Sequence, residues 1–350
     1  MLVDPLSWLV YAMAIALGLV LVRASPDARG LTQAAQALAL AGGASAIGCL
    51  LLGHSLFGAI RGLSWGVFLA APVGLLAACV WLRGRTRWAS ALAGLLLGGL
   101  AIEAFLVEPG SIEVNTFELH SDKVTEPLRI VVLSDIQTDH VDAYTREAIA
   151  LGLAQEPDLV LLPGDYIQRD WGWDWRLEPE SRALNEAFVQ AGLGDVPWVA
   201  VSGDIDDSSW PEHFAGIPGG TATPRTETLE LAGVVVDTLS IGDSRASTLR
   251  IVEQDALHIV LGHAPDFALS RPSADLLVAG HTHGGQVVLP VIGPLMTLTD
   301  LPRDQASGHT TLDNGSELFV SRGIGMERID APRLRLLCRP EVLVIDVLPL

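Results

Sequence analysis

The sequence predicts an all-α membrane-spanning region followed by a domain of mixed α/β class. The first prediction rests on four consecutive apolar stretches within the first 107 residues. The second rests on five short apolar runs that each end at an Asp or a His. With 49% hydrophobic residues and a mean hydropathy of +0.39, the chain is too apolar for an ordinary soluble protein, so the apolar excess is localised.

The apolar stretches run from Leu6 to Val22, Leu31 to Leu52, Leu63 to Leu82 and Trp88 to Val107. Each is close to the roughly 20 residues that a helix needs to span a bilayer. Helices of a soluble bundle keep a polar face, whereas these stretches are apolar on all sides. We therefore expect a bundle of four transmembrane helices in residues 1–107.

The charges of the short loops orient this bundle. Arg23 and Arg29 lie in the first loop and three arginines lie at positions 83–87 in the third, against Arg61 in the second. Basic loop residues collect on the cytoplasmic side of a membrane. We therefore expect a multi-pass protein of the cell membrane whose N-terminus and C-terminal domain are extracytoplasmic.

The chain becomes polar after the last apolar stretch. Residues 108–128 are expected to form a linker with a leading strand at Ile112 to Leu119. Up to Val107 there are six Arg and three acidic residues, so the remaining 16 basic and 38 acidic residues leave a formal net charge of −22. Such a negative field repels phosphate backbones, which excludes nucleic acid as a partner.

The α/β domain is expected at residues 129–350. Its five apolar runs are short and bounded by Gly, Ser or Pro, as in strands buried on both faces. They cover Ile130–Leu133, Leu159–Leu162, Trp198–Val201, Ile259–Leu261 and Leu276–Ala279. The spacers at 142–154 and 180–191 are patterned as crossover helices. Further strands expected at Thr228–Leu231, Val234–Leu239 and Thr248–Val252 have few helices between them, which favours two mixed sheets.

Polar side chains follow these runs, where parallel strands of an open α/β sheet place ligand sites. The candidate ligands are Asp135, Gln137, Asp165, Asp204, His263, His281 and His283. Carboxylates and imidazoles without thiolates favour Mn, Fe or Zn, and seven ligands exceed what one ion needs. Two divalent ions about 4 Å apart would activate water for in-line attack on phosphorus. We therefore expect a phosphoester hydrolase with two divalent metal ions, Mn first and Fe or Zn as alternatives.

The ordered motifs Asp135-x-Gln137, Gly164-Asp165, Ser-Gly-Asp204-Ile-Asp206, Gly262-His263 and Gly280-His281-x-His283 resemble those of calcineurin-like metallophosphoesterases. The GHTHGGQ form of the last motif is similar to a membrane-anchored branch related to UDP-2,3-diacylglucosamine hydrolases. The resemblance implies a four-layer αββα sandwich of two mixed sheets and attack by a metal-bridging hydroxide. It places Asp135, Gln137, Asp165 and His283 on one metal, and the bridging Asp165 with Asp204, His263 and His281 on the other.

The motifs depart from the family pattern at three positions. Gln137 replaces His with a neutral ligand, and Asp204 replaces Asn, adding a charge that favours hard ions such as Mn. Ile205 replaces the His that protonates the leaving group or stabilises the transition state. Asp206 is the candidate substitute catalytic acid, with His213 as a second choice. The alternative hypothesis is that the chain is a metal-binding pseudoenzyme or a regulatory head, which lacks turnover because Ile205 replaces the usual His.

Attachment to a lipid bilayer suggests a phosphate or diphosphate on a lipid-linked substrate. Trp171, Trp173 and Trp175 lie close behind the Asp165 motif. They are expected either to form an apolar lip near the site or to pack a loop onto the core.

Overall fold

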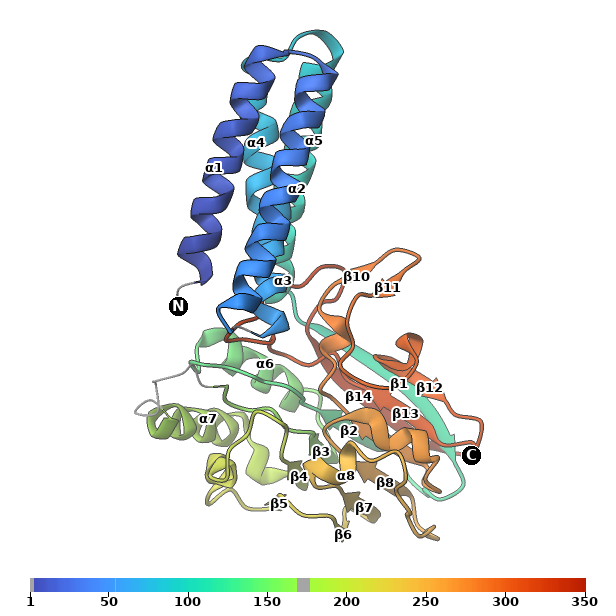
Figure 1. Cartoon of the computed structure of the whole chain (residues 1–350). Coiled ribbons are helices and arrows are strands. Elements are labelled where there is room, and N and C mark those ends of the chain that lie inside the picture. The colour runs from blue at the N-terminus through green and yellow to red at the C-terminus, as the bar shows by residue number, and fades with distance from the viewer. Residues whose placement is uncertain (1–2, 54, 169–176) are drawn as a thin grey trace. The chain divides into compact units, whose positions relative to one another are not determined.

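The computed structural model describes residues 3–53, 55–168 and 177–350, and it separates into two compact units (Figure 1). The first unit comprises residues 1–107 with Asp330–Arg333, and the second comprises Glu108–Ile329 with Leu334–Leu350. The tryptophan loop considered as a lip over the site lies outside the described residues.

The first unit consists of long apolar helices. They are α1 (Val3–Ala24), α2 (Ala28–Leu51), α3 (Leu56–Trp65), the π-helical turn η1 (Gly66–Ala70), α4 (Ala71–Ala78), α5 (Gly84–Ile102) and the π-helical turn η2 (Glu103–Val107). Among the described residues, four helical stretches are long and apolar enough to cross a membrane. These are Ser7–Ala24, Ala28–Leu51, Leu56–Ala78 and Gly84–Gly110.

The third stretch differs from the prediction. It starts at Leu56, so Arg61 lies inside α3 and not in a loop. Its Nη2 lies 4.0 Å from a carboxylate oxygen of Asp330, which offsets the charge within the helix. The π-helical turn ends two residues before Pro72, whose missing N–H interrupts the α-helical hydrogen-bond pattern.

Small and hydroxyl side chains join these helices. Ser7 and Ser45 hydrogen-bond through their hydroxyls at 2.7 Å, and the hydroxyl of Tyr11 donates to the carbonyl of Gly62 at 2.8 Å. A Cβ at Gly62 would lie 2.8 Å from Oγ of Ser45, so this glycine allows the helices to approach closely. Such contacts are typical of helix packing in lipid, where apolar burial gives no driving force.

The second unit contains two six-stranded mixed sheets. The first has the order β1 (Glu113–Ser121), β14 (Glu341–Pro349), β2 (Leu128–Val132), β3 (Leu159–Leu162), β4 (Trp198–Val201) and β5 (Gly220–Thr223). The second has the order β12 (Gly308–Thr311), β13 (Glu317–Val320), β9 (Leu276–Ala279), β8 (His258–Leu261), β7 (Val234–Thr238) and β6 (Glu227–Leu231). Strands β2 to β5 are parallel, as are β7, β8, β9 and β13.

Alternate side chains of each central strand serve two cores. In β2, Ile130 and Val132 face the second sheet, where they meet residues such as Ile259 and Val278. Val131 faces the opposite way, toward α6 (Ala143–Leu153) and α7 (Leu177–Ala191), which cover that face of the first sheet (Figure 1). Both faces are buried, so the strands are continuous apolar runs.

The outer face of the second sheet is covered differently. Its third core contains Phe267 of the 3₁₀ turn η7 (Pro265–Ser270), and the four-residue helix α8 (Ile241–Ser244) lies beside this turn. This layer is therefore made of short helical turns and loops, not of long helices. The strand expected at Thr248–Val252 was wrong. Leu249 and Ile251 pack onto the third core through their side chains, without backbone pairing.

Candidate metal centre

The parallel strands bring the predicted ligands to one place. Asp135, Asp165 and Asp204 follow β2, β3 and β4, while His263 and His281 follow β8 and β9. The parallel strands of each sheet have their carboxyl ends at the same edge. The two edges meet where the sheets pack together. Residues from five strands therefore surround a single centre.

Four of these residues form what we call the Asp204 cluster: Asp165, Asp204, His263 and His281. One ligand atom from each lies within 4.8 Å of the others. Nε2 of His263 lies 3.1 Å from Oδ1 of Asp204 and 3.4 Å from Oδ1 of Asp165. Nδ1 of His281 lies 3.4 Å from the same Asp204 oxygen. Two carboxylates and two imidazoles at these distances are a donor set for one divalent cation.

Asp135, Gln137 and His283 form a neighbouring group, which we call the Gln137 pocket. All three are buried, and Nε2 of His283 lies 3.9 Å from Oδ1 of Asp135. Oε1 of Gln137 and Nδ1 of His283 are buried without a hydrogen-bond partner among the described residues. Buried polar atoms are normally paired. Unpartnered acceptors beside a buried carboxylate therefore fit a second cation.

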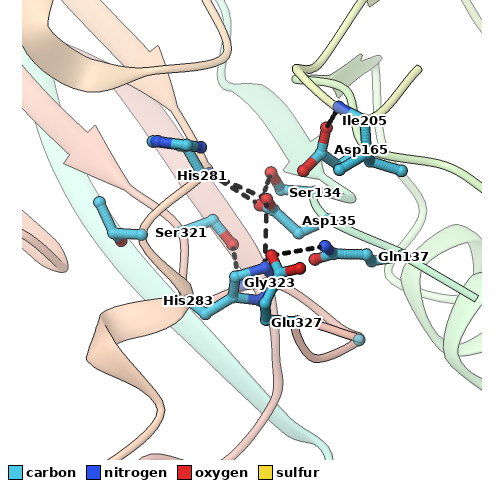
Figure 2. A network of polar contacts seen from close by, with 12 residues as sticks. Ser134, Asp135, Gln137, Asp165, Ile205, His281, His283, Ser321, Gly323 and Glu327 are labelled. Atoms are coloured by element: carbon cyan, nitrogen blue, oxygen red, sulfur yellow. Dashed lines mark hydrogen bonds and ion pairs between the residues drawn. The ribbon is translucent and has the colours of Figure 1, made fainter. Parts of the chain in front are cut away.

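The amide of Gln137 is held in one orientation. Its Nε2 donates to Oε1 of Gln168 at 3.2 Å and to Oε2 of Glu327 at 3.0 Å. Glu327 also accepts from Nε2 of Gln168 at 2.8 Å, and burial raises the pKa of this carboxyl. Figure 2 shows Glu327 beside Gln137. Because two acceptors fix the amide nitrogen, the amide oxygen is left for a ligand.

Sequence reasoning missed the loop that carries Glu327. The backbone N–H of Glu327 donates to Oε1 of Gln286 at 2.8 Å, so the last residue of GHTHGGQ positions this loop. The next residue, Arg328, donates through Nε to the carbonyl of Gln137 and through Nη1 to Asp139. The one sequence signal was the unassigned Gln286, since Glu327 itself belongs to none of the recognised motifs.

Backbone conformation marks the same residues. The predicted ligands Asp135, Gln137, Asp165, His281 and His283 have φ angles between +37° and +71°. This left-handed region is rare for residues other than glycine, and each such residue costs on the order of 1–3 kcal/mol. Strain gathered on these ligands is typical of a functional site.

Glycines let the loops approach one another. A Cβ at Gly280 would lie 2.2 Å from Oδ2 of Asp135, and one at Gly203 would lie 1.9 Å from Oδ1 of Asp165. The N–H of His281 donates to both oxygens of Asp135, at 2.9 and 3.1 Å (Figure 2). The glycines are required because these carboxylates occupy the space of a side chain.

The pKa values of Asp204 and His263 are shifted because several charged groups lie close together in the Asp204 cluster. Burial alone would raise the pKa of Asp204, but hydrogen bonds from His263 and His281 hold it well below its usual value. Burial lowers the pKa of His263, but Asp165 and Asp204 raise it well above its usual value. A proton on His263 therefore offsets carboxylate charge that a divalent cation would offset instead.

His283 behaves in the opposite way. Its burial lowers its pKa to about 4, against the effect of Asp135. The imidazole is therefore neutral at physiological pH, which is the form that binds metals.

Arg245 lies at the open side of the Asp204 cluster. Its Nη2 donates to Oδ2 of Asp204 at 2.7 Å, and its side chain is 50% exposed. Asp204 carries a charge that an Asn would lack, and this arginine offsets part of it. The guanidinium is also the kind of group that binds phosphoryl oxygens.

The structure does not support Asp206 as the catalytic acid. Its carboxylate accepts the backbone N–H groups of Asp165 at 2.9 Å, Tyr166 at 3.0 Å and Gly203 at 2.8 Å. Burial and the neighbouring Asp165 raise its pKa to about 7, whereas its backbone donors lower it. A proton on Asp206 would face one of these fixed donors. Asp206 therefore joins the two ligand loops and is a positioning residue.

Neither Ile205 nor His213 supplies the missing proton donor. The N–H of Ile205 donates to Oδ1 of Asp165 at 3.1 Å, a contact that any residue here would make. His213 is 2% exposed, hydrogen-bonds Oγ of Ser181 at 2.6 Å and contacts the ring of Tyr166. It belongs to the core beneath α7, because its ring packs among aromatic side chains.

Comparisons with known proteins find chains that are similar to this one. Residues 128–285 match the model of the calcineurin-like phosphoesterase family. The phosphodiesterase YaeI of Escherichia coli is 28% identical over 267 residues, covering 69% of this chain and 90% of that protein. The metallophosphoesterase YkuE of Bacillus subtilis is 28% identical over 281 residues, covering 74% and 93%. A solved dimetal phosphatase from Danio rerio covers 56% of this chain and 88% of its own, with 11% identity and a TM-score of 0.35.

Proposed function

We propose that this chain, whose residues 128–285 match the model of the calcineurin-like phosphoesterase family, is a metallophosphoesterase that hydrolyses a phosphodiester or diphosphate with two divalent metal ions. The observation that carries this proposal is the pair of adjoining donor groups, the Asp204 cluster and the Gln137 pocket. A phosphodiesterase among the relatives supports the diester as the substrate class. The relation to UDP-2,3-diacylglucosamine hydrolases stays a proposal.

The residues of the centre have different roles in this proposal. The Gln137 pocket would hold one ion and the Asp204 cluster the other, with Asp165 between them. When bound, such a pair activates water and polarises the phosphoryl group for in-line attack. The N–H of Ile205 and the carboxylate of Asp206 keep the Asp165 loop in place. Arg245 would exchange Asp204 for a phosphoryl oxygen of the substrate, adding positive charge where the transition state gains negative charge.

We also propose that the metal is Mn, with Fe or Zn as alternatives, and that the substrate is linked to a lipid. The oxygen-rich donor set, including the amide of Gln137, supports a hard ion. The four apolar stretches support attachment to a membrane, and the loop charges support an extracytoplasmic position of residues 108–350.

Hydrolysis by the purified full chain tests the proposed function. The chain with Mn should hydrolyse bis(p-nitrophenyl) phosphate, and a chelator should abolish this activity. Asp165→Asn should lower kcat by at least about 100-fold, because it weakens both metal positions. Glu317→Gln, a change at a carboxylate outside the centre, is the matched control. Wild-type chain without activity on phosphodiesters and diphosphates would refute the proposal.

Substituting Ile205 tests how the site works without the usual histidine. A p-nitrophenolate leaving group needs little protonation, whereas an alkoxide needs much. Ile205→His should therefore raise kcat on an alkyl phosphodiester by about 10²-fold and change the rate on bis(p-nitrophenyl) phosphate only slightly. Equal gains on both substrates would show that residue 205 does not act through the leaving group.

A further inference from the structure

The segment after GHTHGGQ forms a small hairpin with an apolar tip. In this hairpin, β10 (Val288–Leu289) pairs with β11 (Gly293–Pro294). The side chains of the tip point to solvent, with Val291 109% and Ile292 59% exposed, and Leu295 at the base is 49% exposed. We call residues 288–295 the apolar hairpin.

The hairpin is unusual in a domain that is otherwise acidic. No Asp, Glu, Lys or Arg occurs between Asp275 and Asp300. Val291 has a φ of +71°, a strained conformation for a β-branched residue, and the chain keeps it at a site with no core to fill. Exposed apolar groups of this kind mark interaction sites.

The base of the hairpin is attached to the candidate metal centre. Nε2 of His281 hydrogen-bonds the carbonyl of Leu298 at 3.2 Å, shortly after the hairpin ends. A Cβ at Gly285 would lie 2.6 Å from Cβ of Pro294, so the hairpin packs directly on the metal motif. A molecule that binds the hairpin is therefore presented next to the ligands.

We propose that the apolar hairpin inserts its tip into the outer part of a lipid bilayer and presents lipid-borne phosphate groups to the metal centre. The second half of this statement rests on the proposed function. The bilayer is the occupant because the same chain carries four stretches able to cross one. The tip also offers only aliphatic side chains, without a charge or side-chain donor for a protein partner to match. An uncharged tip enters an anionic membrane surface that repels acidic regions.

Fluorescence tests insertion without any need for activity. Val291→Cys in the full chain is labelled with an environment-sensitive maleimide dye and reconstituted in nanodiscs of phosphatidylcholine and phosphatidylglycerol. Val252→Cys is the matched control, because Val252 is 77% exposed on the same unit. The unsubstituted chain gives the background from the native cysteines.

The dye at position 291 should show blue-shifted emission and should be quenched by nitroxide-labelled acyl chains, whereas the dye at 252 should show neither. If both dyes behave alike, the hairpin does not insert. A blue shift at 291 without quenching by the lipid nitroxide would show that protein covers the tip, and it would also overturn the proposal.

Kinetics test presentation of the substrate. The double variant Val291→Asp with Ile292→Asp should hydrolyse soluble bis(p-nitrophenyl) phosphate at the wild-type rate. It should lose activity on a p-nitrophenyl phospholipid ester in phosphatidylcholine vesicles. Unchanged activity on the vesicles would contradict presentation by the hairpin. Failure of the wild-type chain on both substrates would instead refute the proposed function, while the fluorescence result would still decide insertion.

Discussion

At the residue scale, the positions of the candidate ligands in the fold were predictable because they follow a general rule of α/β sheets. Asp135, Asp165 and Asp204 each follow a buried strand, and the sequence shows both the apolar strand and the polar residue behind it. Glu327 follows no such rule. It reaches Gln137 through a loop fixed by Gln286, and its contacts arise only when distant segments fold together. A similar limit applies to Asp206, whose carboxylate faces backbone donors that the sequence does not reveal.

Glu327 should therefore control metal binding without being a ligand. Glu327→Gln replaces a two-oxygen acceptor by an amide whose nitrogen would face the donor groups of Gln137 or Gln168. The Gln137 amide would lose its fixed orientation, and affinity for one of two Mn ions should fall by about 10–100-fold. Isothermal titration with Mn measures this change.

Glu317→Gln, at a carboxylate that pairs with His309, controls for a general effect of removing negative charge. Equal Mn affinity in the Glu327→Gln variant and the wild-type chain would show that the amide does not need this partner.

At the scale of elements, the strands were found because burial on both faces makes them continuous apolar runs. The sequence also located the leading strand, which pairs in parallel with β14 from Glu113 onward. It was less informative where side chains pack without backbone pairing, as at Thr248–Val252. The start of α3 was missed because Arg61 was placed in the second loop, whereas it lies inside the helix and Asp330, far along the chain, balances its charge.

The packing of α7 onto the 3₁₀ turn η6 (Trp210–Phe214) should make stability depend on pH. Burial lowers the pKa of His213 to about 4 in the folded chain, below the value of about 6.5 expected when unfolded. Between these values the unfolded chain binds a proton that the folded chain does not. The free energy of unfolding should therefore fall with decreasing pH in this window, by about 3 kcal/mol in all.

His213→Asn keeps a hydrogen-bonding atom near Ser181 but cannot take up the proton. Denaturant unfolding of the full chain in detergent should show a shallower loss of stability for this variant between about pH 6.5 and pH 4. His120→Asn, at an exposed histidine, should follow the wild-type slope. A wild-type slope in the His213 variant would mean that this residue is not buried in its neutral form.

At the scale of the whole molecule, four helical stretches that are long and apolar enough to cross a membrane precede an acidic domain. The proposed orientation predicts that residue 252 is accessible from outside the cell and that the first loop is not. Val252→Cys should react with a membrane-impermeant maleimide in intact cells, and Ala28→Cys only after permeabilisation. The reverse pattern would place the acidic domain in the cytoplasm.

We propose that the Asp204 cluster and the Gln137 pocket each hold a divalent ion, with Asp165 of the cluster between the two ions. Elemental analysis of the purified full chain, saturated with Mn and freed of excess metal, measures this most directly. We predict two metal ions per chain, with fewer than one retained by Asp165→Asn. At most one ion per wild-type chain would contradict the two-metal centre.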